Sequence, residues 1–210
     1  MKVLIGCFAF LVPLAGLGRA QGDNPSSREY EVKAAFLYNL VKFVEWPQKR
    51  MSDPNEPITI GILGKDPFGK AFDPIKDKPV EGRKIVVRRL RSFAEMKQGG
   101  EPKAAEKDVE KEVQAWRRCH VMFICASEQK YLKEILDRVK EHPVLTVGDT
   151  KGFLESGGII NFVIEQEKVR FEISTAAAKL AGLKIRSQLL RLAKRVVQPA
   201  DAGGSEKKRD

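Results

Sequence analysis

Three short segments of the chain are almost wholly apolar: ITIGILG at residues 58–64, CHVMFIC at 119–125 and PVLTVG at 143–148. Apolar runs of this length, without alternation, indicate strands that are buried on both faces, and such strands are typical of parallel sheets. Segments with a helical spacing of apolar residues separate the strands or precede them, as at 29–46 and 127–142. This order predicts a three-layer α/β fold, with a mostly parallel sheet and helices on both of its faces.

Other segments complete the predicted fold. Residues 83–90, RKIVVRRL, form a further strand pattern, and residues 158–174 contain two strand patterns joined by a turn at 165–168. Two strands joined by a tight turn pair antiparallel, so we expect an antiparallel hairpin near the C-terminus. The charged segment 98–112 is expected to be a surface excursion with a helix in its second half. Residues 175–197 have helical spacing, broken near Gly182.

The first twenty residues have the pattern of a secretory signal peptide. Lys2 is followed by an apolar run over residues 3–17, and the small residues Gly18 and Ala20 stand where a cleavage site requires them. The run is shorter than the roughly 20 residues that span a bilayer. We therefore expect export to the periplasm and these parts: a signal peptide at 1–20, a flexible N-terminus at 21–28, a single α/β domain at 29–197 and a disordered tail at 198–210.

The positive charge of the chain is concentrated in two stretches. The formal net charge is +10, whereas residues 78–91 carry +5 and residues 168–197 carry +7, so the rest of the chain is slightly negative. A basic surface can meet nucleic acid, anionic lipid or an acidic protein. Export and the lack of a basic run with interleaved aromatic residues argue against nucleic acid. A solvated face and an acidic protein partner both remain open.

The two cysteines outside the predicted signal peptide, Cys119 and Cys125, are six residues apart in one predicted strand. Along a strand this is roughly 20 Å, beyond the reach of a disulfide, so both are predicted to be free thiols. Strand alternation would place Cys119 and Cys125 on one face and His120 on the other. We therefore expect no metal site here, and no cofactor.

The first helical segment, 29–46, has an apolar arc that covers more than half of its circumference, which predicts that it packs into the domain. Tyr38 lies on the narrow polar face, and Trp46 stands at the end, before Pro47. Half-exposed Tyr and Trp side chains serve as interface anchors, or simply pack at a helix end. Both are candidate partner-binding residues, with packing favoured for Trp46.

No residue pattern predicts an enzyme. The segment 61–69, GILGKDPFG, resembles a phosphate loop, but Lys65 is followed by Asp66 rather than Ser or Thr. Neither His120 nor His142 lies in a motif with a nucleophile.

A small-ligand crevice is the alternative that the strand ends offer. Gly64, Asp66 and Asp149 follow predicted strands, where open α/β sheets bind ligands. For Asp149 a simpler role is to cap the turn that follows it.

Five blocks occur in an order that resembles the YfiR family of bacterial periplasmic proteins. The resemblance extends over nearly all of residues 29–197, and the blocks read EYEVKAAFLYNLVKFVEWP, ITIGILGKDPFG, CHVMFICASE, VLTVGDTKGFLESGGIINFV and VRFEISTAAAKLAGLKIRSQLLRLAKRV. Two features depart from the family: Cys119 has no visible disulfide mate, and Ser174 stands where Asn commonly follows FEI.

The resemblance implies a non-catalytic regulator. Members of the YfiR family bind the sensory domain of an inner-membrane diguanylate cyclase and hold it inactive, and an outer-membrane lipoprotein can sequester these members. The alternative is a periplasmic small-ligand receptor, and the oligomeric state stays open, a homodimer included. For a protein partner, the candidate contact residues are Tyr38, Trp46, Arg88, Arg89, Arg170 and Arg191.

Overall fold

The computed structural model describes residues 25–98 and 102–198, and its centre is a seven-stranded sheet in the order β3-β2-β4-β5-β6-β7-β9. These strands are β2 (Ile58–Leu63), β3 (Ile85–Leu90), β4 (Val121–Ile124), β5 (Leu145–Gly148), β6 (Ile160–Glu165), β7 (Lys168–Ser174) and β9 (Arg195–Val197). All neighbouring pairs are parallel except β6 and β7. The predicted mostly parallel sheet and its antiparallel hairpin are confirmed.

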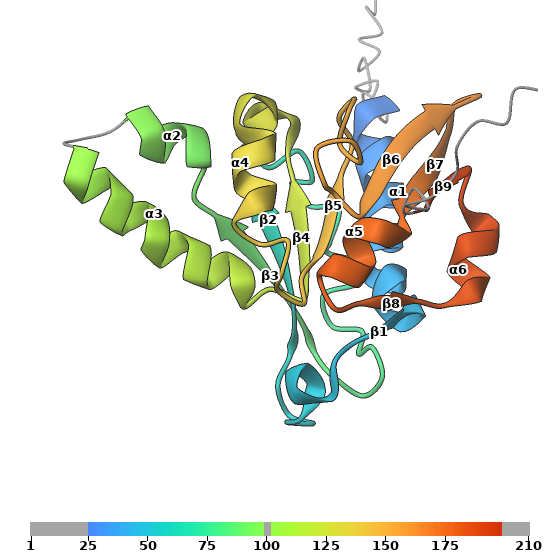
Figure 1. The fold of residues 1–210 in the computed structure, drawn as a ribbon. Coiled ribbons are helices and arrows are strands. Elements are labelled where there is room, and N and C mark those ends of the chain that lie inside the picture. The colour runs from blue at the N-terminus through green and yellow to red at the C-terminus, as the bar shows by residue number, and fades with distance from the viewer. Residues whose placement is uncertain (1–24, 99–101, 199–210) are drawn as a thin grey trace, which may run out of the picture.

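Helices cover both faces of this sheet, which confirms the three-layer α/β fold (Figure 1). α1 (Pro25–Leu40) packs on one face, whereas α2 (Phe93–Gln98), α3 (Pro102–Arg117) and α4 (Leu132–Asp137) pack on the other. The other elements are α5 (Thr175–Leu180), α6 (Ser187–Leu192), the 3₁₀ helices η1 (Val41–Phe43), η2 (Gln48–Met51) and η3 (Ala126–Tyr131), and the paired strands β1 (Val44–Glu45) and β8 (Lys184–Ile185).

The sheet separates two apolar cores. In β4, Val121 and Phe123 face the core beneath α1, while Met122 and Ile124 face the core beneath α2, α3 and α4. Side chains alternate across a strand, so a central strand with a core on each side must be apolar at every position. This is the physical reason for the unbroken apolar runs in the sequence.

Three segments differ from their predictions, and one of them, Lys184–Ile185 within the segment predicted to be helical, forms β8. The first helix ends at Leu40 rather than near Trp46, because Val44 and Glu45 pair with Ile185 and Lys184 in an antiparallel two-stranded sheet. Residues 195–197, predicted to be helical, form β9 and extend the main sheet beyond β7. In each case, pairing with a strand distant in sequence overrides the local helical spacing.

Cys119 and Cys125 are both free and buried, which confirms the predicted thiols. Their placement on one face was wrong: Cys119 joins the core beneath α3, and Cys125 joins the core beneath α1. β4 begins only at Val121, so its alternation does not extend back to Cys119. Burial raises the pKa of Cys119 to about 11, which keeps this thiol protonated and unreactive at neutral pH.

Several expectations concern the ends of the chain. The predicted signal peptide at 1–20 and the tail from residue 199 lie outside the described residues, and so do residues 99–101 of the charged segment. Residues 25–28, expected in the flexible N-terminus, form the first turn of α1. Among the helices that the structure describes, none has the length and apolarity required to cross a membrane.

Candidate functional site

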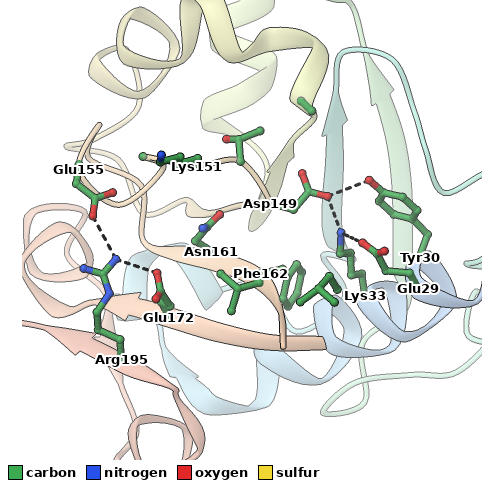
Figure 2. Close-up of a pocket in the computed structure, with 15 residues that line it drawn as sticks. Glu29, Tyr30, Lys33, Asp149, Lys151, Glu155, Asn161, Phe162, Glu172 and Arg195 are labelled. Carbon is green, nitrogen blue, oxygen red and sulfur yellow. Dashed lines mark hydrogen bonds and ion pairs between the residues drawn. The ribbon is translucent and has the colours of Figure 1, made fainter. Parts of the chain in front are cut away.

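An open cleft of about 740 Å³ lies at the carboxyl ends of β4 and β5. Its floor includes Thr150, the second residue after β5, and Asn161 in β6. One wall comes from α1, and the opposite wall comes from residues of β7, β9 and the segment after β5 (Figure 2). Open parallel sheets commonly bind ligands at this edge, because the strand ends leave a crevice between the loops.

The α1 wall is held by a buried ion pair. Lys33 Nζ lies 2.7 Å from Asp149 Oδ2 and 2.5 Å from Glu29 Oε1, and the side chains of Lys33 and Asp149 are only 3% and 7% exposed. The Tyr30 hydroxyl donates to the same Asp149 oxygen at 2.9 Å. Burial, together with the Asp149 charge, raises the pKa of Tyr30 above its ordinary value, so its hydroxyl stays a donor. This cluster ties α1 to the end of β5.

The opposite wall contains a second ion-pair cluster. Arg195 Nη2 lies 2.8 Å from Glu172 Oε2 and 3.2 Å from Glu155 Oε1. Figure 2 shows Arg195 between these two carboxylates, with Asn161 between this cluster and the Lys33 cluster. The cleft is therefore bordered by charges that are largely neutralised within its own walls.

Of the three predicted ligand residues, only Asp149 lines the cleft. Its described hydrogen bonds go to α1 and not to the following turn, so the interpretation of Asp149 as a turn cap was wrong.

Gly64 and Asp66 contribute to structure elsewhere. Gly64 adopts φ +96° and lies so close to Ser127 and Glu128 that an added Cβ would overlap them. Asp66 accepts a hydrogen bond from the Phe68 amide at 2.7 Å, and its other oxygen pairs with Arg89. The crevice predicted beside β2 is thus filled by side chains that follow β4.

The two aromatic candidates are half-buried and packed. The Tyr38 hydroxyl donates to the Pro79 carbonyl oxygen at 3.0 Å, and Lys42 Nζ lies 4.7 Å from the centre of its ring. Trp46 packs edge-to-face on His120, with ring centres 5.6 Å apart. Tyr38 therefore holds the segment after β2 against α1. Trp46 follows β1 rather than a helix, and it packs against His120, in line with the packing role favoured for it.

The four arginine candidates lie at opposite ends of the main sheet. Arg88 and Arg89 are exposed on β3, one edge strand, while Arg170 is exposed on β7 near the other edge. Arg191 is exposed on α6, which precedes β9. The two basic stretches therefore do not form one continuous site, because four strands, β2, β4, β5 and β6, separate β3 from β7.

His120 is fully buried just before β4, and its pKa is lowered to about 4 by burial and by the charges of Arg50 and Arg83. Its Nδ1 accepts a hydrogen bond from the Thr59 amide at 3.1 Å, which requires the neutral ring.

We predict that the fold loses stability on acidification through His120. The unfolded state takes up a proton below about pH 6.5, whereas the folded state resists it until about pH 4. The contribution of neutral His120 to the free energy of unfolding is complete above pH 6.5. About 2 kcal/mol of this contribution is lost between pH 8 and pH 5. Urea unfolding at both pH values measures this loss. His120→Asn, which keeps an acceptor but does not titrate, should lose less; equal losses in both proteins would contradict the assignment.

Residues 30–194 match the YfiR/HmsC-like family. The chain belongs to this family. The resemblance seen in the sequence is therefore confirmed, and the match runs from α1 to the residue before β9. A search of curated proteins finds no match to this YfiR/HmsC-like chain.

Two solved structures are similar to this YfiR/HmsC-like chain. A conserved domain protein from Vibrio cholerae O1 biovar El Tor is 13% identical with a TM-score of 0.48, over 80% of this chain and 60% of that one. The ABC domain in complex with L-Trp from Streptococcus pneumoniae is 12% identical with a TM-score of 0.47, over 83% of this chain and 61% of that one. The chain thus spans less than two thirds of either protein.

Sequence reasoning missed most of the cleft in this YfiR/HmsC-like chain. Lys33 offered one signal. It stands four positions before the apolar Leu37, and this spacing places a charged residue on the buried face of the helix. Asn161 offered another, as a polar residue within an apolar strand pattern. No group of three or more metal-ligating side chains gathers within residues 25–98 and 102–198.

Proposed function

We propose that this chain is a periplasmic, non-catalytic regulator that binds the sensory domain of an inner-membrane signalling enzyme, a diguanylate cyclase, and inhibits it. The observation that carries the proposal is the family match over residues 30–194. Membership of the YfiR/HmsC-like family is consistent with regulation of a cyclase from the periplasm. An outer-membrane lipoprotein is a second proposed partner, which would sequester the chain and relieve the inhibition.

Exposed basic residues at the sheet edges support an acidic surface on the partner. Arg88 and Arg170 are exposed and, within the described residues, neither forms an ion pair, so both charges are available to a partner. Arg89 is less available, because it binds Asp66 at 2.8 Å and the Gly69 carbonyl oxygen at 3.2 Å. Exposed charges at the rim of an interface mainly steer association and are screened by salt.

Deletion of the gene is expected to raise cyclic di-GMP in the host, and expression of the exported chain should restore the lower level. The physical reason is that the free cyclase would no longer be held inactive. Quantification of cyclic di-GMP by mass spectrometry, with pull-down of inner-membrane proteins by the tagged chain, measures both halves of the proposal. An unchanged level together with no captured sensor would refute it.

Charge reversal then identifies the edge that meets the partner. Arg88→Glu and Arg170→Glu form a matched pair on opposite sides of the sheet, and only the one near the interface should slow association, by several-fold at low salt. Stopped-flow or surface-based kinetics at two salt concentrations measures the rate. Tyr38→Phe and Tyr38→Ala are compared at equal concentrations of folded protein. Tyr38→Phe removes only the hydrogen bond to Pro79, whereas Tyr38→Ala also removes any contact that the ring makes with the partner.

A further inference from the structure

Two buried side chains in the cleft have polar atoms without a hydrogen-bond partner in the part of the chain that the structure describes. These are the Thr150 hydroxyl and the Asn161 side-chain carbonyl oxygen. Thr150 is 7% exposed and Asn161 is 6% exposed. Both oxygens lie just beneath the surface of the cleft that their residues line. Buried polar groups in folded proteins are almost always satisfied, so these two oxygens point to a bound molecule toward which their side chains turn.

The charged groups of the walls are mostly committed to each other. Asp149, the least exposed carboxylate of the cleft, pairs with Lys33, and Glu172, whose side chain is 14% exposed, pairs with Arg195. Among the described residues that line the cleft, no buried carboxylate is left to receive the ammonium group of a ligand. An ammonium group buried against neutral oxygens alone would be poorly compensated.

One cation of the cleft remains available. Lys151 follows Thr150 directly, is exposed, and forms no ion pair within residues 25–98 and 102–198. In Figure 2 it lies on the same side of the cleft as Glu155, above Asn161. The uncommitted groups are thus one cation beside a neutral hydroxyl and a neutral amide.

We propose that this cleft binds a small hydroxylated carboxylate, of the chemical class of the sugar acids. Lys151 pairs with the ligand carboxylate, and the Thr150 hydroxyl and the Asn161 amide hydrogen-bond its hydroxyl groups. A phosphate dianion fits less well, because the carboxylates of Glu29, Asp149, Glu155 and Glu172 also line the cleft. The proposal is independent of the regulatory function, and binding is measured without any cyclase.

Isothermal titration calorimetry of the purified protein with D-gluconate tests the proposal, with D-glucose, propionate and L-serine as comparisons. Gluconate should bind saturably. Glucose, which lacks the carboxylate, and propionate, which lacks the hydroxyl groups, should each bind roughly three- to tenfold more weakly. Equal binding of glucose would remove the role of Lys151, and tighter binding of serine would replace the proposed class by amino acids. No heat with any of the compounds at millimolar concentration would mean that water alone occupies the cleft and would overturn the site.

Two variants make the test specific. Thr150→Val removes the unsatisfied hydroxyl at constant shape, so the melting temperature should stay equal or rise while gluconate affinity falls roughly three- to tenfold. Lys151→Met should weaken gluconate to the level of glucose, whereas Lys179→Met, on α5 and outside the cleft, should leave binding unchanged. A lower melting temperature of Thr150→Val with unchanged affinity would assign this hydroxyl to the fold and contradict its role in binding.

Discussion

Lys33→Met is expected to destabilise the folded protein by about 3 kcal/mol, because it leaves the Asp149 carboxylate charged, buried and without its cation. Lys33 and Asp149 are 3% and 7% exposed, and their atoms lie 2.7 Å apart. Tyr30 can still donate one hydrogen bond to Asp149, but a neutral donor does not replace a buried positive charge. Urea unfolding followed by circular dichroism measures the loss.

Two further variants test the cause of this loss. Lys33→Met combined with Asp149→Leu removes both charges, so it should recover a large part of the stability that the single change removes. Lys184→Met breaks an exposed pair with Glu45, in which the lysine side chain is 77% exposed, and should cost no more than about 0.5 kcal/mol. A loss in Lys33→Met as small as that of Lys184→Met would show that the buried pair does not stabilise α1 on the sheet.

Gly158→Ala is expected to destabilise the fold by about 3 kcal/mol, because its new Cβ would overlap the Phe153 ring. Phe153 is fully buried, and its ring lies between Gly158 on one side and Gly148 on the other. A Cβ added at Gly148 would overlap the opposite edge of the same ring. The ring therefore cannot move away from one glycine without approaching the other. Thermal unfolding of the variant measures the effect.

The double variant Gly158→Ala/Phe153→Leu should be more stable than the sum of its single changes, since a smaller side chain leaves room for the new methyl group. Gly152→Ala is a control from the same segment: it has φ +79° and no atom within 4 Å of an added Cβ, so it meets backbone strain alone. The expected cost there is about 1 kcal/mol. If the two alanine variants proved equally stable, crowding at Phe153 would not be the reason for Gly158.

Local patterns were sufficient for the architecture but not for the element ends. The apolar runs at 58–64, 119–125 and 143–148 each became a strand between two cores, since only that position makes an unbroken apolar strand favourable. Residues 195–197 have helical spacing and nonetheless form β9, because the free edge of β7 offers backbone partners that no local pattern records.

The candidate site shows the same division. Asp149 was found from its position after a strand, which a sequence reveals. Lys33 and Arg195 lie 116 residues and 23 residues from their partners Asp149 and Glu172, and their pairing depends on where α1 and β9 dock.

The sequence by itself therefore determined the α/β class, the antiparallel hairpin, the free thiols and the resemblance to the YfiR family, because each depends on periodicity, spacing or short residue blocks. Tertiary structure alone decided that Arg88 and Arg170 lie toward opposite edges of the sheet, and that Thr150 and Asn161 meet in one cleft without partners. Surfaces and cavities are made by residues distant in the chain, and their positions follow from strand order and helix docking, which local sequence does not encode.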